Sequence, residues 1–359
     1  MSAQATQDPM IGSLLDGRYQ LIARLGRGGM GNVYLAEETR LRRRCALKVL
    51  HPHLTEDRTH VERFLREAQM IAQLEHPNIV DIYAYGEEPS GVVWFAMELL
   101  TGEDLDARSK GRVARPFSTH QCCLWGIQIA QAMTVVHQGG LIHRDLKTSN
   151  IFLATRKDGQ EVVKLLDFGI ARPEEGSELT ATGVALGTPS YMSPEQVRNV
   201  VVDRRSDIYS FGVLLFKLVT DRLPFTGDAV QVALAQCTLP IPAPSSIGAA
   251  RDISPELDAL VLRATEKVPG DRFQTMREVE DALWSILQAE APELMPSTTG
   301  GRMIGQTQIG RATESAARLV PPADAQTAST AAQATGATSA VPVRGRGRAS
   351  ASMWLLAGA

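Results

Sequence analysis

Residues 143–169 contain a spaced set of polar side chains whose types suit chemistry on metal-bound phosphates. The set is His143-Arg144-Asp145-Leu146-Lys147, then Asn150, and then Asp167-Phe168-Gly169. Asp145 precedes Asn150 by five residues and Asp167 by 22, with strand-like residues between them. Asn150 and Asp167 can offer two oxygen ligands to Mg²⁺, while Asp145 is a separate carboxylate base for a hydroxyl. We therefore expect these groups to converge from neighbouring loops.

A second pattern, residues 26–33 (GRGGMGNV), fits the spacing G-x-G-x-x-G-x-V. This run is weak evidence alone, because glycines often only form a turn. A dinucleotide-binding fingerprint needs a helix directly after the glycines, whereas residues 32–36 alternate as a strand. A P-loop is excluded because Gly31 is followed by Asn32 and not by lysine with serine or threonine. The glycines are therefore predicted to join two strands and to bring backbone N–H groups near phosphates.

Lys48 lies inside the apolar run of residues 45–50, where an unpaired ammonium is costly to bury. Glu67 is the expected partner, because the apolar stripe of the following helix would seat its carboxylate against the strand. The alternative is a surface lysine whose stem packs on apolar neighbours while its charge reaches water.

The elements that must position these residues divide into two parts. Period-two alternation predicts strands near residues 19–23, 33–35, 45–50, 79–85 and 92–99, with one amphipathic helix over 61–74. After Gly102 the pattern is mainly helical, with helices near 125–136, 208–218, 255–262 and 275–287. The sequence predicts a β-rich lobe of about 80 residues followed by an α-rich lobe of about 190.

The composition is that of an ordinary globular enzyme, with 44% hydrophobic and 21% charged residues among 359. The net charge of −3 indicates neither nucleic acid nor an acidic substrate as an obligatory partner. Four cysteines show no metal-binding spacing, and adjacent Cys122 and Cys123 suit a structural disulfide poorly, which favours the reducing cytoplasm. We expect no secretory signal, and no stretch of 18 apolar residues is present.

Together these motifs resemble, in order and context, the signature set of the eukaryotic-type protein kinases, and most of all the bacterial Ser/Thr protein kinases. Ser193-Pro194-Glu195 adds a further matching motif, and the resemblance covers residues 19–288. It implies an α+β, two-lobed protein-kinase-like fold. The kinase domain would span residues 18–290, with a small β-rich N-lobe (18–100) holding one helix and a larger α-helical C-lobe (101–290).

The resemblance implies transfer of the γ-phosphoryl group of ATP, with Mg²⁺ or Mn²⁺, to Ser or Thr hydroxyls of proteins. Lys48 would bind the α- and β-phosphates and be held by Glu67, and Asn150 and Asp167 would bind the metal. Asp145 would orient or accept the hydroxyl proton. Lys147 would stabilise charge on the transferring group.

The same resemblance implies a nucleotide site between the lobes. Met97 would be the gatekeeper, backbone groups of Glu98 and Leu100 would read the adenine edge, and Asp104 would lie near the ribose. The remaining contacts would come from the glycines Gly26, Gly28 and Gly31 around the phosphates and from Leu25, Val33, Ala46 and Phe152 against the adenine.

The type of acceptor and the regulation also follow from the resemblance. Lys147 and Thr188, the latter on the platform for the acceptor peptide, favour Ser or Thr over Tyr. Thr180 and Thr182 resemble activation sites, where a phosphate could pair with Arg144 and order the loop. Two departures from the family pattern, Thr148 for Pro and Ser193 for Ala, remove no charge or ligand. Structural roles fall to a buried Glu195–Arg272 ion pair and to Asp207 beneath the catalytic loop.

The remaining segments are predicted to lie outside the folded domain. Residues 1–17 are expected to be flexible, and residues 291–343 form a linker rich in Ala, Thr, Ser and Pro that cannot bury a core. From residue 291 onward six arginines and three acids give +3, which leaves −6 for residues 1–290. Within the linker, Thr307-Gln308-Ile309-Gly310 is a candidate for phosphorylation and for a phosphothreonine-binding partner.

Residues 344–359 combine three arginines with seven final residues that are mostly apolar. This order is typical of a cytoplasmic basic flank before a membrane helix, but seven residues cannot span about 30 Å of hydrocarbon. Two interpretations stay open: the start of a membrane segment that continues past residue 359, or an apolar tail. A homodimer is a family expectation, and the kinase domain is expected in the cytoplasm.

Two rival functions compete with an active protein kinase. A pseudokinase scaffold would hold nucleotide without transferring phosphate, but Lys48, Asp145, Asn150 and Asp167 are all present. A kinase-like phosphotransferase for small molecules is disfavoured by residues 187–195, which resemble the platform that holds a peptide.

Overall fold

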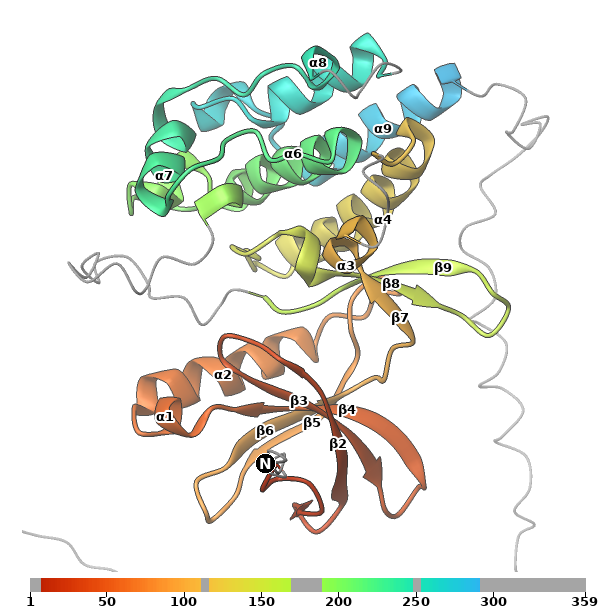
Figure 1. The fold of residues 1–359 in the computed structure, drawn as a ribbon, viewed down its shortest axis with the longest axis vertical. Helices are drawn as coiled ribbons and strands as arrows, with labels where there is room; N and C mark the ends of the chain where they lie inside the picture. The colour runs from red at the N-terminus through yellow and green to blue at the C-terminus, as the bar shows by residue number, and fades with distance from the viewer. Residues whose placement is uncertain (1–7, 111–115, 169–188, 248–252, 291–359) are drawn as a thin grey trace, which may run out of the picture. The chain divides into compact units, whose positions relative to one another are not determined.

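The computed structural model describes residues 8–110, 116–168, 189–247 and 253–290. Strands dominate up to Met97, and helices dominate after Asp104 (Figure 1). The described chain therefore has the α+β, two-lobed organisation that the sequence predicts.

The N-lobe is built on a six-stranded antiparallel sheet with the strand order β1-β2-β3-β4-β6-β5. The strands are β1 (Leu14–Leu15), β2 (Tyr19–Arg27), β3 (Gly31–Glu38), β4 (Arg43–Leu50), β5 (Ile82–Glu87) and β6 (Val93–Met97). The glycine-rich turn joins β2 to β3, and Lys48 on β4 lies opposite Val33 of β3 on one side and Phe95 of β6 on the other. The sheet thus fixes the glycine-rich turn and Lys48 relative to each other.

Helix α2 (Arg58–Ile71) follows the single turn α1 (Pro52–Thr55) and packs against the sheet (Figure 1). The helix begins three residues before the predicted start, because Asp57 caps it by accepting a hydrogen bond of 2.8 Å from the Thr59 N–H. The apolar stripe of α2 shares a cluster with β4 and β6 that contains Leu50, Val61, Phe64, Ala68, Val93 and Phe95. This packing buries Glu67 on the same helix.

A second antiparallel sheet, in the order β7-β8-β9, carries the loops with the polar motifs. It consists of β7 (Gly102–Asp104), β8 (Ile151–Thr155) and β9 (Glu161–Leu165), with the short 3₁₀ helix η1 (Thr148–Asn150) before β8. Ile151 pairs with Leu165, and the Leu166 N–H donates to the Asn150 carbonyl at 2.9 Å. The hairpin therefore brings Asn150 beside the segment that contains Asp167.

The C-lobe is helical. Its helices are α3 (Leu105–Lys110), α4 (Thr119–Gln138), α5 (Pro194–Val197), α6 (Arg204–Thr220), α7 (Ala229–Thr238), α8 (Pro255–Ala264) and α9 (Met276–Glu290), with 3₁₀ turns η3 (Pro189–Tyr191), η4 (Pro244–Ser246) and η5 (Pro269–Asp271). Helix α6 is buried almost all round, as its apolar sequence predicts. The largest apolar cluster joins α4, α6, α8 and α9.

The first three predicted strands are longer in the structure, and the two later ones are displaced at their ends. The strand expected over residues 79–85 begins at Ile82, because Ile79 forms only an isolated bridge with Leu165. The strand expected over 92–99 ends at Met97.

The four cysteines of the chain all lie in the described residues, and no disulfide joins them. Cys45, Cys122 and Cys123 are buried, whereas Cys237 is half-buried. Burial raises the pKa of the Cys45 thiol to about 11, so it stays protonated at neutral pH. Within the same described ranges, no helix combines the length and apolar character needed to cross a membrane.

Candidate active site

The glycine-rich turn is shaped by one close backbone approach. A Cβ atom added to Gly31 would lie 2.1 Å from the Val49 carbonyl oxygen of β4, so only glycine fits there. The Gly28 N–H donates to the Gly31 carbonyl at 2.8 Å. His51 supports the turn from behind, because its Nε2 lies 3.0 Å from the Gly28 carbonyl oxygen.

The Lys48 ammonium forms an ion pair with Asp167, with 2.6 Å between Nζ and Oδ1. Lys48 is only 6% exposed. Burial acts to lower the pKa of Lys48, but the neighbouring carboxylates, with the negative charge of Asp167 foremost, raise the pKa above its ordinary value. The Asp167 side chain is 47% exposed, so burial raises its pKa only weakly, and the Lys48 charge and hydrogen bond bring the pKa below the ordinary value.

Within the described residues, the Lys48 ammonium does not form the predicted ion pair with Glu67. It pairs with Asp167 instead. Glu67 is 3% exposed, and burial raises its pKa to about 8 although the nearby Lys48 charge acts to lower it. At neutral pH a large share of Glu67 is therefore protonated, and an uncharged carboxyl has little attraction for the ammonium.

The loop around Asp145 is held by two polar side chains. The Lys147 ammonium donates to Asp145 Oδ2 at 2.7 Å. The Asn150 amide nitrogen donates to the Asp145 carbonyl at 2.8 Å, to Asp145 Oδ2 at 3.1 Å and to the Asp167 carbonyl at 3.2 Å. The structure thus brings together Lys48, Asp145, Lys147, Asn150 and Asp167.

The donor set fits a magnesium ion. The Asn150 amide nitrogen is engaged with protein acceptors, so the amide oxygen is the atom left for a cation, and Asp167 supplies a carboxylate beside it. No cluster of three or more His, Cys, Asp or Glu side chains suited to a metal occurs in the described residues.

Asp207 at the start of α6 fixes the backbone before Asp145. Its carboxylate accepts hydrogen bonds from the His143 N–H at 2.9 Å, the Arg144 N–H at 2.8 Å and His137 Nε2 at 2.8 Å. Burial acts to raise the Asp207 pKa, but these donors and the His137 charge lower it overall. Arg144 has φ of 63°, a left-handed conformation that a non-glycine residue adopts only when its surroundings impose it.

The buried His143 ring connects this loop to the segment after β9. It stacks on Phe168, with 4.6 Å between ring centroids and 29° between ring planes. Burial lowers the pKa of His143, so its ring is neutral at neutral pH and suits an apolar neighbour.

The predicted adenine side is formed by separate elements. Ala46 of β4 is buried, Val33, Met97 and Phe152 are half-buried, and Leu25 is exposed. The Glu98 N–H donates to the Asp81 carbonyl at 2.9 Å, so this N–H is not available to a ligand. Asp104 Oδ1 accepts from the Ala107 N–H at 2.8 Å and caps α3. Their roles toward nucleotide stay predictions.

The expected structural ion pair between Glu195 and Arg272 is present. Arg272 Nη1 and Nη2 lie 2.7 and 2.8 Å from the two Glu195 carboxylate oxygens. Both residues are buried, and Ser206 Oγ donates a further hydrogen bond of 2.5 Å to Glu195. This pair ties α5, in which the predicted acceptor platform ends, to the segment before α9.

Three predicted regulatory and platform residues, Thr180, Thr182 and Thr188, lie outside the described residues. Sequence reasoning in turn missed the contribution of His51 to the glycine-rich turn. No local pattern marks it, because its partner Gly28 is 23 residues away.

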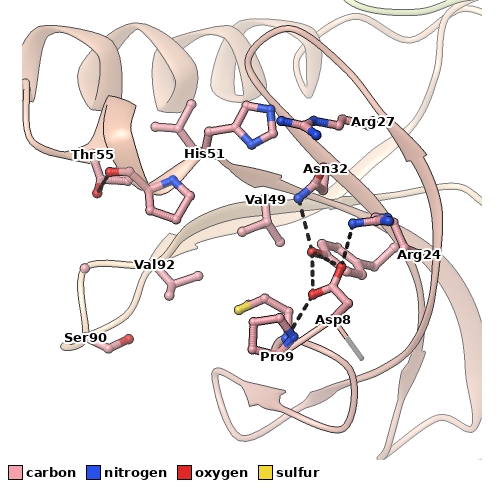
Figure 2. A pocket seen from close by; sticks show the side chains of 15 residues that line it. Asp8, Pro9, Arg24, Arg27, Asn32, Val49, His51, Thr55, Ser90 and Val92 are labelled. Carbon is pink, nitrogen blue, oxygen red and sulfur yellow. Dashed lines mark hydrogen bonds and ion pairs between the residues drawn. The ribbon is translucent and has the colours of Figure 1, made fainter. Parts of the chain in front are cut away.

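A pocket of about 490 Å³ lies elsewhere in the N-lobe (Figure 2). On one side, the Tyr34 hydroxyl donates to Asp8 Oδ2 at 3.1 Å, and Arg24 forms an ion pair with the same carboxylate at 3.1 Å. None of the predicted site residues lines this pocket. It is therefore separate from the cluster around Asp145.

The amino-acid sequence is similar to those of several curated serine/threonine-protein kinases. Among curated relatives, the chain is 39% identical over 277 residues to the serine/threonine-protein kinase pkn3 of Myxococcus xanthus, which covers 74% of this chain and 49% of the relative. It is 39% identical over 286 residues to the serine/threonine-protein kinase PknB of Mycobacterium tuberculosis, covering 78% and 45%. The chain thus spans about half the length of these relatives.

The solved crystal structure of the Mycobacterium tuberculosis PknI kinase domain matches with a TM-score of 0.62 at 29% identity, covering 77% of this chain and 98% of that one. This match confirms the two-lobed fold. The model of the protein kinase domain family matches residues 19–285. The chain therefore belongs to the protein kinase domain family.

Proposed function

We propose that this protein is an ATP- and Mg²⁺-dependent serine/threonine protein kinase. The observation that carries the proposal is the convergence of Lys48, Asp145, Asn150 and Asp167, which come from three segments of the chain: strand β4, the loop that contains both Asp145 and Asn150, and the segment after β9. Its curated relatives are named serine/threonine-protein kinases. Mg²⁺ bound by Asn150 and Asp167 would neutralise phosphate charge.

The side chains around Asp145 have complementary tasks in this proposal. The Asp145 carboxylate would orient the acceptor hydroxyl and take up its proton as the new O–P bond forms. Lys147, already 2.7 Å from Asp145, would stabilise negative charge on the transferred group. Lys48 would hold the α- and β-phosphates, for which it must exchange its contact with Asp167 for the nucleotide.

An Asp145→Asn variant tests the proposal. Purified protein is incubated with labelled ATP, Mg²⁺ or Mn²⁺ and a basic protein acceptor such as histone. We expect label on Ser or Thr, and a loss of about 10²- to 10⁴-fold in the variant, because the amide cannot accept the proton. Equal nucleotide affinity in both proteins serves as the folding control. Wild-type protein that binds ATP but labels no protein would indicate a scaffold, and label on small molecules alone would indicate the other rival.

Autophosphorylation of Thr180 or Thr182 is proposed as the activating event, with Arg144 as the partner of the new phosphate. A phosphate adds about −1.5 to −2 charge at neutral pH, enough to pair with a guanidinium. Substituting both threonines by alanine should lower activity toward a protein acceptor. Undiminished activity in the double variant would remove this part of the proposal. The homodimer and the phosphothreonine-binding partner stay predictions.

A further inference from the structure

Residues 189–191, which lie within the predicted acceptor platform (187–195), are held through their backbone carbonyls. Gln236 of α7 donates from Nε2 to the Ser190 carbonyl at 2.7 Å and, more weakly, to the Pro189 carbonyl at 3.4 Å. Ser210 of α6 donates to the Tyr191 carbonyl at 2.7 Å. Three successive carbonyls of η3 thus accept from side chains of two C-lobe helices.

The orientation of the Gln236 amide is fixed by a chain of donors. The Lys267 ammonium, which can only donate, lies 2.7 Å from the Tyr209 hydroxyl. The Tyr209 hydroxyl therefore donates to Gln236 Oε1 at 2.6 Å, which turns Nε2 toward the carbonyls. Gln236 is fully buried (0% exposed), so water cannot replace these bonds.

The other end of the same segment reaches the loop around Asp145. The Tyr191 hydroxyl lies 3.1 Å from Thr148 Oγ1, three residues after Asp145, and Thr148 is buried. A shift of residues 189–191 relative to α7 would therefore change the distance between these platform residues and the proposed catalytic carboxylate of Asp145.

We propose that Gln236 is a positioning residue for the protein acceptor. It sets the placement of residues 189–191, which belong to the predicted platform, relative to Asp145. The inference rests on the proposed kinase function, and it adds a residue that touches neither nucleotide nor the reacting atoms. Gln236 carries no part of the nucleotide site, so acceptor binding and nucleotide binding should separate when it is changed.

A Gln236→Leu variant keeps a side chain of similar size but has no N–H to donate. It leaves the Ser190 carbonyl and the Tyr209 hydroxyl without their buried partner. We expect the KM for histone to rise about tenfold, which corresponds to about 1.4 kcal/mol, while the KM for ATP changes less than about twofold. The parallel measurement of both KM values distinguishes displaced acceptor binding from general damage to the fold.

Gln231→Leu is the matched control on the same helix. Gln231 belongs to the capping box of α7, where its side-chain oxygen accepts a hydrogen bond from the Asp228 N–H at 3.2 Å, and it makes no hydrogen bond to residues 189–191. The control should lower thermal stability somewhat without changing the KM for histone. A Gln236→Glu variant gives a second test, because a buried carboxyl can donate to the Ser190 carbonyl only when protonated. Its KM for histone, relative to wild type, should fall as the pH is lowered.

The outcomes separate two kinds of failure. Wild-type protein that phosphorylates no protein overturns both the kinase proposal and this inference. An active wild type with an unchanged histone KM in both Gln236 variants overturns the inference alone. The inference also fails if histone and ATP KM values rise equally in Gln236→Leu, or if Gln231→Leu gives the same acceptor defect. If Gln236→Leu does not fold, a pH-independent KM ratio for Gln236→Glu overturns it.

Discussion

Lys48 Nζ and Asp167 Oδ1 lie 2.6 Å apart, although 119 residues separate them along the chain. The contact joins β4 of the N-lobe to the segment after β9, and it neutralises two groups that the proposed function assigns to phosphate and metal. In the proposed function, nucleotide binding would therefore replace an ion pair that the protein makes within itself.

Replacing Lys48 by methionine should weaken nucleotide binding. The variant lacks the charge that lowers the Asp167 pKa, and it offers no cation to the phosphates. We expect the affinity for Mg²⁺-ATP, measured by calorimetry, to fall at least about tenfold. This fall corresponds to the free energy of one lost charge-assisted hydrogen bond. Lys147→Met is the contrasting variant, in which turnover should fall more than affinity. Identical effects of the two substitutions would contradict the assigned roles.

Glu67 should make the stability of the protein dependent on pH. Its pKa of about 8 in the fold exceeds the ordinary 4.5, so its contribution to the unfolding free energy is complete below pH 4.5 and is lost as the pH rises to 8. Glu67→Gln removes this loss. Urea unfolding at pH 5, 6.5 and 8 without nucleotide should show the variant gaining on wild type as the pH increases. A difference that stays constant with pH would argue against the raised pKa.

Gly31→Ala should disturb the glycine-rich turn. The added methyl group would meet the Val49 carbonyl at 2.1 Å, so β3 and β4 must move apart. We expect a loss of about 1–3 kcal/mol in unfolding free energy and weaker nucleotide binding. Gly29→Ala is the matched control, because an added Cβ there has no neighbour within 4 Å. Comparable losses in the two variants would show that steric contact is not the cause.

Arg272→Met should strongly destabilise the C-lobe. The substitution leaves the Glu195 carboxylate buried without its bidentate partner, which costs about 3–5 kcal/mol. Arg277→Met is the control, since Arg277 pairs with Glu280 and Asp281 while its side chain is 63% exposed, and exposed pairs contribute about 0–1 kcal/mol. Denaturant titration of both variants checks the difference. An Arg272→Met loss as small as that of the control would mean that Glu195 finds another partner.

The sequence predicts that Asn150 and Asp167 meet near Asp145, because a single hairpin of neighbouring strands brings them together. Ile151 pairs with Leu165, so Asn150 and the segment of Asp167 meet whenever β8 and β9 form. The partner of Lys48 is different. The choice between Glu67 and Asp167 depends on how α2 and the segment after β9 pack around the Lys48 ammonium, which a residue pattern does not contain.

Helix α7 shows a second limit of sequence patterns. Two of its apolar residues, Val230 and Leu234, are 77% and 62% exposed, so its hydrophobic spacing does not mark a buried face. The contacts of Gln236 are equally hidden, because its partners lie 27 and 46 residues away and belong to other elements. Only the packed structure brings them together.

The half-buried thiol of Cys237, next to Gln236 in the sequence, can be labelled with a dye without introducing a new cysteine. Cys237 is the one cysteine of the four that is not buried, so mild maleimide treatment of native protein should attach a dye at this position first. Its sulfur lies 3.8 Å from the Pro194 carbonyl, next to the segment that Gln236 secures. Fluorescence from that dye would report directly when a protein acceptor engages this side of the C-lobe.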